Sequence, residues 1–146
     1  MTNKTDEKLP FWEAGSFNQD LGIEMLEWRE GYAKIKLEVQ QRHLNRSDAL
    51  HGGVMATLLD AVTGYAGTWC SVPGNARRGA TLNLTTNLLA AGGLGAVYAE
   101  ADVVGGGRKI FFAEGRVIDS QGKLLATASA TYKLFRGSEE ITGMPI

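Results

Sequence analysis

Residues 51–70 read HGGVMATLLDAVTGYAGTWC, and this stretch predicts one long helix that begins at Gly52 or Gly53 and runs to about Cys70. It contains no proline, and a helix of this length would extend roughly 27 Å. Large apolar side chains lie on nearly every side of it: Val54, Met55, Leu58, Leu59, Val62, Tyr65 and Trp69. Because a helix that is apolar all round needs cover all round, we expect this one to be buried.

Membranes and nucleic acids are not expected partners of this chain. Asp60 lies in the middle of the apolar helix, and Gly64 and Gly67 interrupt it, so the run is too short and too broken to span a membrane. The 146 residues include 15 Lys and Arg and 16 Asp and Glu, for a net charge of −1. That balance provides no electrostatic attraction for nucleic acid or for an anionic membrane surface.

The redox compartment is indicated by the cysteine count. Cys70 is the one cysteine and cannot form an internal disulfide, so we interpret it as a buried structural thiol. The first ten residues, MTNKTDEKLP, lack the apolar core of a signal peptide. Both observations predict a cytoplasmic protein.

Alternating segments predict two strands before the helix and four after it. The first two lie within residues 21–39, on either side of a turn at Glu30-Gly31. The later four, separated by glycine-rich or polar turns, are Ala80–Leu89, Ala96–Val104, Ile110–Asp119 and Leu124–Phe135. In the last of them alanines at 126, 128 and 130 share one face, which lets another element approach closely. The expected fold class is therefore α+β, with one long helix packed on a single curved antiparallel sheet of about six strands.

One domain accounts for most of the chain. Residues 1–20 are expected to be loose or to form a short helix, the latter around residues 11–17. A single domain then covers residues 21–136, and residues 137–146 form a polar C-terminal tail.

Asp60 and the start of the helix are the two features that suggest chemistry. An ionised carboxylate inside an apolar helix is costly unless it is paired, solvated or protonated, and in a cleft it can serve as a general base or nucleophile. His51-Gly52-Gly53 lies where the helix begins, so its backbone N–H groups and the helix dipole can stabilise an oxyanion. Both features also have ordinary structural explanations, a wet helix edge and a plain glycine-containing helix start.

Helical geometry restricts how the two features can cooperate. Gly52 and Asp60 are eight residues apart, which places them about 12 Å apart along one helix axis and rotates them by about 80°. One small reacting group cannot touch both. If both act on the same carbonyl, Asp60 must come from a second, antiparallel copy of the helix, so an enzyme of this kind has to be a dimer.

The pattern resembles the hotdog-fold acyl-CoA thioesterases, in the branch related to the phenylacetate-pathway thioesterase. Asn45, His51-Gly52-Gly53 and Asp60 carry the resemblance, together with GATLNLTTNLL at residues 79–89. It covers roughly Gly22 to Phe135 and includes the order of the predicted elements. It implies a hotdog fold, with dimers that join two sheets and often pair into tetramers.

The resemblance also implies residue roles. The Gly52 position donates its N–H to the thioester carbonyl with help from the Asn45 position, while Asp60 of the partner subunit activates water or attacks the thioester. The Thr81 hydroxyl orients that water, where close relatives carry serine. His51 fixes the loop before the helix, and His51 and Gly53 are expected to line the bound substrate. No metal or cofactor is needed, since coenzyme A is part of the substrate.

Two basic segments are candidates for the phosphates of coenzyme A. Gly105-Gly106-Gly107-Arg108-Lys109 is a plain hairpin turn by composition and lacks the setting of a P-loop. In a hotdog protein, Arg108 and Lys109 become candidate phosphate contacts, and Arg77-Arg78 is a weaker rival for that task. A metal site is not expected, because the spacing of His43, Asp48, His51 and Asp60 matches no zinc or non-haem iron signature.

Three functions remain open on this basis. Hydrolysis of an acyl-CoA thioester is favoured, with a small aromatic or a short or medium-chain acyl group. A hotdog dehydratase or hydratase, with His51 and Asp60 paired across the dimer, is the second. The third is a non-catalytic acyl-CoA-binding protein, which needs no residue to activate water.

Overall fold

The structure is a computed structural model that describes residues 12–146. The longer elements, in chain order, are α1 (Gly15–Leu21), β1 (Glu24–Arg29), β2 (Tyr32–Val39), α2 (Gly52–Gly67), β4 (Gly79–Leu88), β5 (Gly95–Gly106), β6 (Ile110–Asp119) and β7 (Leu124–Leu134). Three short elements complete the chain: the 3-10 turn Gln41–His43 and the two-residue strands β3 (Asn75–Ala76) and β8 (Met144–Pro145).

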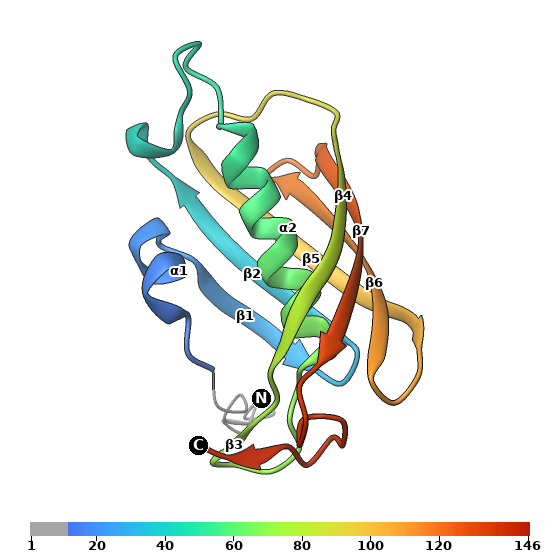
Figure 1. The fold of residues 1–146 in the computed structure, drawn as a ribbon. Coiled ribbons are helices and arrows are strands. Elements are labelled where there is room, and N and C mark those ends of the chain that lie inside the picture. Colours follow the sequence, from blue (N-terminus) through green and yellow to red (C-terminus); the bar gives the residue numbers. More distant parts are fainter. Residues whose placement is uncertain (1–11) are drawn as a thin grey trace, which may run out of the picture.

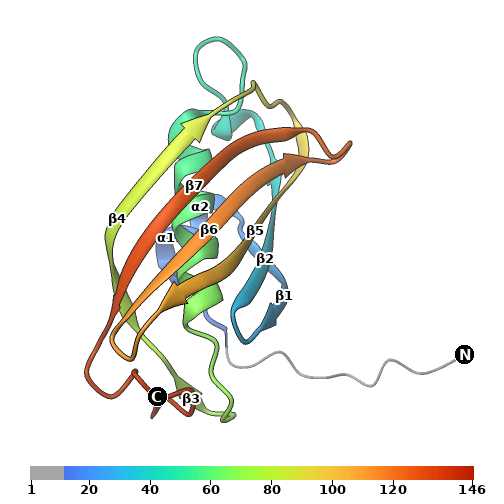
Figure 2. The ribbon, with the colours of Figure 1, turned by 90° about the vertical axis from the view of Figure 1, so that its right-hand side faces the viewer.

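A six-stranded antiparallel sheet curls around α2. Its strand order is β1-β2-β5-β6-β7-β4, so β1 and β4 are the edges. Figures 1 and 2 show the sheet wrapped around one side of the helix, with α2 between α1 and β4. The predicted α+β class with one helix on a curved antiparallel sheet is confirmed.

The strands form where alternation predicted them. In β2, Ala33, Ile35, Leu37 and Val39 are buried, while the residues between them are more exposed. The four later strands match their predicted bounds to within two residues, and β6 spans Ile110–Asp119 as predicted. In the four inner strands β2, β5, β6 and β7 the buried face is the one toward α2, because only that face can escape water in a sheet with one helix.

The prediction for the long helix was wrong in two respects. It ends at Gly67 rather than near Cys70, where Thr68 takes the C-cap position and the Arg77 guanidinium donates to the carbonyls of Gly67 and Trp69. These bonds satisfy carbonyl groups that a helix end leaves without partners. The helix is also buried on one face only, through Met55, Leu58, Leu59, Val62, Thr63 and Ala66. The sheet covers that face, so the opposite face of a single chain stays partly exposed.

Two further segments flank the sheet in sequence, one before β1 and one after β7. The short helix expected around residues 11–17 is found as α1, shifted to Gly15–Leu21. The loose segment expected at residues 1–10 lies outside the described residues. In the C-terminal segment, β8 pairs with β3, and Cys70 is buried with its thiol 3.2 Å from the carbonyl of Thr142. Within residues 12–146, no helix is long and apolar enough to cross a membrane.

Candidate active site

Asp60 lies at the middle of α2 on its partly exposed face. Its carboxylate oxygen Oδ1 accepts a hydrogen bond of 2.7 Å from the hydroxyl of Thr81 on β4. Tyr132 of β7 is the cross-strand neighbour of Thr81, and its hydroxyl lies 3.1 Å from the same oxygen. The register of β4 shifts directly after Thr81, and such a bulge re-aims a side chain. The Asp60 carboxylate is therefore held by two hydroxyl groups at the edge of a hollow.

That hollow has a volume of about 480 Å³. It is lined by α1, α2 and β4 through Phe17, Asn18, Ala56, Thr57, Asp60, Ala61, Thr81 and Leu84. The small side chains of Ala56 and Ala61 leave the space above the helix, and Phe17 exposes 65% of its surface beside it. A carboxylate beside an apolar hollow suits a reaction on a substrate with an apolar group.

Tyr132 is a site residue that the sequence analysis missed. Its hydroxyl donates to the backbone carbonyl of Asp60 at 2.6 Å and lies 2.8 Å from the hydroxyl of buried Thr63. Burial raises the pKa of Tyr132, and the negative charge of Asp60 raises it further. The sequence places Tyr132 on the same strand face as alanines 126, 128 and 130, which indicates burial but not a contact with Asp60.

The start of α2 is capped by its own histidine. The ring nitrogen Nδ1 of His51 accepts the N–H of Gly53 at 2.8 Å, so His51 is the N-cap of α2. Gly53 therefore donates its N–H inside the chain. No acceptor within residues 12–146 meets the N–H of Gly52, which stays available to a ligand. Among the glycines of this turn, Gly52 is the candidate oxyanion donor.

Asn45 lies in the loop that leads to this helix start. Its Oδ1 accepts the backbone N–H groups of Ser47 and Ala49, at 2.9 and 3.2 Å. The backbone of His51 in turn donates to the carbonyl of His43 at 2.9 Å, which ties the loop to the helix. The carboxamide oxygen is thus committed to the loop, and the Nδ2 amino group is the part of Asn45 that can donate to a ligand.

The predicted catalytic residues thus fall into two groups. Asp60 and Thr81 meet at the middle of α2, whereas Asn45 and Gly52 gather at its N-terminal end. β4 runs alongside α2, since a Cβ on Gly52 would meet the side chain of Leu88, at the opposite end of β4 from Thr81. A single chain does not bring the two groups together.

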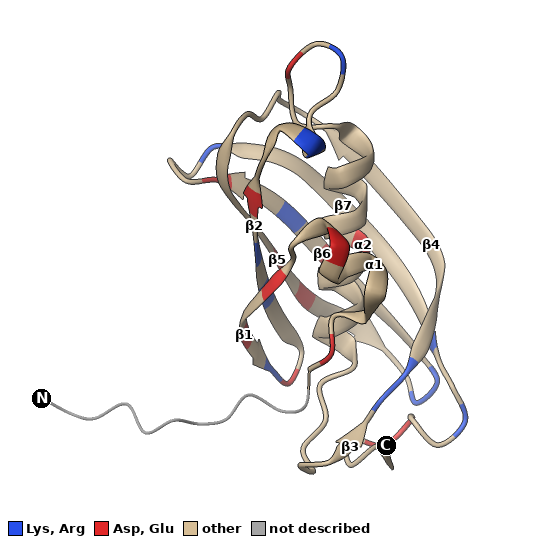
Figure 3. Cartoon of the chain, turned by 90° about the vertical axis from the view of Figure 1, so that its left-hand side faces the viewer, with Lys and Arg blue, Asp and Glu red and all other residues tan. Residues whose placement is uncertain are grey.

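The basic residues line a groove at one end of the sheet. Arg108 and Lys109 share a groove of about 550 Å³ with Lys133 and Arg136. Arg108 also forms an ion pair with Glu140 at 3.1 Å. Figure 3 shows Lys and Arg gathered at the end of the sheet where β4 begins. Arg108 and Lys109 therefore belong to a larger basic surface than the sequence suggested.

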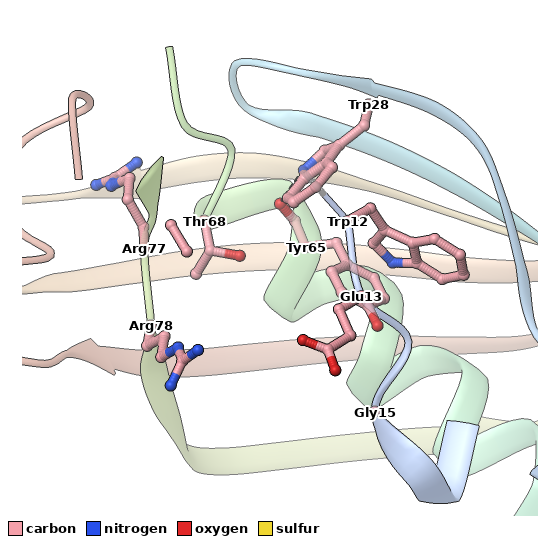
Figure 4. A pocket seen from close by; sticks show the side chains of 9 residues that line it. Trp12, Glu13, Gly15, Trp28, Tyr65, Thr68, Arg77 and Arg78 are labelled. Carbon is pink, nitrogen blue, oxygen red and sulfur yellow. Dashed lines mark hydrogen bonds between the residues drawn. The ribbon is translucent and has the colours of Figure 1, made fainter. Parts of the chain in front are cut away.

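The rival pair Arg77-Arg78 divides into a structural and a surface residue. Arg77 donates to main-chain carbonyls, including that of Ser138 at 2.9 Å, and burial lowers the pKa of its guanidinium. Arg78 is exposed and borders a second hollow, of about 330 Å³, at the C-terminal end of α2. Figure 4 shows this hollow, with aromatic side chains on one side and Arg78 on the other. The two aromatic residues Trp28 and Tyr65 of this hollow are joined by a hydrogen bond of 2.7 Å, which the Trp28 indole donates to the carbonyl of Tyr65.

His43, one of two histidines in the candidate metal set, has a structural role. His43 is buried, with Nδ1 accepting the N–H of Gln40 at 2.9 Å and Nε2 lying 2.8 Å from the carbonyl of Leu21. Both ring nitrogens are thus used by the main chain. In residues 12–146 no three His, Cys, Asp or Glu side chains gather in a way that could hold a metal ion.

Comparison with known proteins places this geometry in context. The family model described as Thioesterase superfamily matches residues 48–126, which include α2 and β4. Thioesterase HI1161 from Haemophilus influenzae is similar in structure, with a TM-score of 0.75, 25% identity and 84% of each chain covered. The PaaI protein from the phenylacetic acid degradation operon of E. coli gives a TM-score of 0.71 and 25% identity, over 80% of this chain and 82% of its own.

Proposed function

Because this chain belongs to the thioesterase superfamily, we propose that it hydrolyses an acyl-CoA thioester at a site shared by two copies of the chain. The hotdog fold and the resemblance to thioesterases of the PaaI type are confirmed. The products would be a carboxylic acid and the thiol of coenzyme A. The acyl group would be a small aromatic or a short or medium-chain one.

The position of Asp60 relative to Gly52 is the observation that carries the proposal. Both lie on one rigid helix, eight residues and about 12 Å apart, and each has the chemistry for a different part of the reaction. An antiparallel second helix would bring the partner's Gly52 to Asp60 and this chain's Gly52 to the partner's Asp60. Two equivalent sites then form across a two-fold axis.

The residues would divide the reaction between the two chains. The N–H of Gly52 and the Nδ2 amino group of Asn45 would donate to the thioester oxygen, where negative charge develops as the carbonyl is attacked. Asp60 of the other chain would either take a proton from the attacking water or attack the carbonyl carbon itself. Thr81 donates its single hydroxyl hydrogen to Asp60 and keeps lone pairs that can accept from the water.

The basic groove supports the coenzyme A part of the proposal. Lys109 and Arg108 border it with two further cations, and phosphate oxygens are the natural partners of such a surface. Arg77 is not a candidate for this task, because main-chain carbonyls already occupy its guanidinium.

Thiol release from a panel of acyl-CoAs tests the proposal. The panel contains phenylacetyl, benzoyl, acetyl and medium-chain esters, and the wild type is compared with Asp60→Asn. We expect hydrolysis of at least one ester and a loss of about 10²–10⁴-fold in Asp60→Asn, because the variant cannot accept a proton. Asp20→Asn, an equally small change at the exposed end of α1, serves as the control and should keep full activity.

Binding of the same esters separates the alternatives. Calorimetry should show that Asp60→Asn still binds the ester that the wild type hydrolyses. A wild type that binds these esters and hydrolyses none of them would contradict the proposal and favour an acyl-CoA-binding protein. Conversion of an enoyl or hydroxyacyl ester without thiol release would favour the dehydratase.

A further inference from the structure

Two hydroxyl groups meet at one oxygen of the Asp60 carboxylate. Thr81 donates to Oδ1 at 2.7 Å from β4, and the hydroxyl of Tyr132 lies 3.1 Å from the same atom on β7. Residues 12–146 supply no such donor to the other carboxylate oxygen, Oδ2. The two oxygens of Asp60 therefore differ in their surroundings before any substrate arrives.

The hydroxyl of Tyr132 has several polar partners within hydrogen-bond distance. A hydroxyl has one hydrogen to donate and two lone pairs that accept. The Thr63 hydroxyl lies 2.8 Å from that of Tyr132, and Tyr132 lies 2.6 Å from the backbone carbonyl of Asp60. Thr63 donates its own hydrogen to the carbonyl of Leu59 at 2.7 Å. The single hydrogen of Tyr132 is therefore shared among the Thr63 hydroxyl, the carbonyl of Asp60 and Oδ1.

The Tyr132 ring has little freedom to move. It stacks on Phe111 with centroids 4.9 Å apart and planes 5° from parallel. On the α2 side it lies against Gly64, where a Cβ would come within 3.3 Å of the ring. Only 4% of Tyr132 is exposed, so its hydroxyl is held at a fixed position behind Asp60.

On the basis of the proposed function, we propose that Tyr132 is a positioning residue for the reaction. Together with Thr81 it fixes Oδ1 of Asp60, and this leaves Oδ2 as the oxygen that meets the attacking water or the thioester carbon. Because Oδ1 is held by hydrogen bonds, the carboxylate keeps one orientation, with Oδ2 directed at the substrate before it binds.

Tyr132 acts as a donor throughout and not as a base. Burial and the negative charge of Asp60 both raise its pKa, so it keeps its proton at every pH at which the enzyme would work. The other side chains that line the Asp60 hollow come from α1, α2 and β4, and none of them titrates: Phe17, Asn18, Ala56, Thr57, Ala61, Thr81 and Leu84.

The kinetic test uses Tyr132→Phe, which removes one oxygen and keeps the stacked ring. We expect kcat to fall about tenfold with KM within about twofold, because ground-state binding does not involve this hydroxyl. Tyr98→Phe, which removes the hydroxyl of a tyrosine whose ring lies under Lys34 on another part of the sheet, should change neither quantity.

A readout without substrate separates this proposal from the proposed function. The NMR chemical shift of the Asp60 carboxyl carbon should change in Tyr132→Phe, which loses a hydroxyl 3.1 Å from Oδ1, and stay unchanged in Tyr98→Phe. An active wild type whose Tyr132→Phe variant folds and keeps its kcat would overturn the positioning role. A lower Tm with an unchanged Asp60 carboxyl signal would reduce Tyr132 to a packing residue and overturn it as well. A changed Asp60 signal in a protein inactive on every ester would keep the contact but refute the thioesterase function, and with it a role in that reaction.

Discussion

The hydrogen bond between His51 and Gly53 explains why a glycine follows two residues after the histidine. The ring of His51 folds back over the first turn of α2 to accept the N–H of Gly53. A Cβ on Gly53 would lie 2.9 Å from the accepting nitrogen, closer than such atoms normally approach. Glycine at this position is thus required by the cap, whether or not a ligand binds nearby. His51 does at this helix start what Ser, Thr, Asp or Asn usually does.

Replacing His51 tests whether this cap is its main role. His51→Ala should lower the free energy of unfolding by about 1 kcal/mol, because the N–H of Gly53 loses its acceptor. His51→Asn keeps a side-chain acceptor of N-cap type and should recover at least half of that loss. Urea denaturation of the three proteins measures the difference.

Activity provides the second half of the same test. His51→Asn should keep most of the thioesterase activity, since the asparagine can hold the helix start but cannot carry a proton. An inactive His51→Asn protein with wild-type stability would contradict the capping role and restore His51 as a chemical group.

At the residue scale, the charge of Asp60 marked it as a candidate site residue in the sequence. Tyr132 had no such mark. A carboxylate within an apolar helix demands an explanation from sequence alone, whereas a tyrosine on the buried face of a strand is ordinary core. The contact between Tyr132 and Asp60 depends on the register of β7 against β4 and on the depth of α2 in the sheet. Neither can be deduced from alternation, which fixes the face of a residue but not its neighbour across the core.

The two glycines in α2 are explained by the elements that pack on it. Gly64 and Gly67 are three residues apart and so lie on one face of the helix, opposite the stacked rings of Tyr132 and Phe111. A Cβ at Gly67 would come within 2.1 Å of the Phe111 ring. The glycines that interrupt the helix pattern in the sequence thus let β6 and β7 bring two aromatic rings against the helix.

Substitution of Gly67 tests this packing between elements. Alanine favours the helix by about 1 kcal/mol, but its methyl group would overlap Phe111, and overpacking of this kind costs about 1–3 kcal/mol. We expect Gly67→Ala to lower the free energy of unfolding, and Phe111→Leu in the same chain to recover part of the loss. Gly93→Ala, where a Cβ meets nothing within 4 Å, is the control and should be close to neutral.

Element bounds and element burial differed in how well the sequence predicted them. Alternation placed β4, β5, β6 and β7 to within two residues. In β5, β6 and β7 buried residues alternate with more exposed ones, whereas the edge strand β4 has no buried residue. The end of α2 was missed by three residues, because it depends on Arg77, which reaches back from beyond the turn. Burial on every side was wrong for the single chain, because one curved sheet covers only one face of a helix.

At the scale of the whole molecule, the face of α2 that the sheet leaves uncovered lies beside β4, one of the two edges of the sheet. β4 is an edge strand, and Leu82 and Leu88 on it are exposed at 58% and 54%. An apolar edge strand has unpaired backbone N–H and C=O groups that can pair with a strand of another chain. A second copy that pairs β4 with β4 would cover the second face of α2 as well, which is the burial that the apolar pattern of the helix demanded. The proposed dimer thus resolves the mismatch between sequence and single chain.

Hybrid dimers test whether the site is shared. Asp60→Asn removes the group at the middle of α2, and Asn45→Asp keeps the loop acceptor Oδ1 while removing the donor at its N-terminal end. Each variant alone should be inactive. A hybrid purified through two different tags should recover about half of the wild-type activity, because one of its two sites combines an intact Asp60 with an intact Asn45. The second hybrid, of wild type with the double variant, should be inactive, since every shared site then contains one defect. A site within one chain predicts the reverse, an inactive first hybrid and a half-active second one, so thiol release from the two hybrids decides between a shared and a single-chain mechanism.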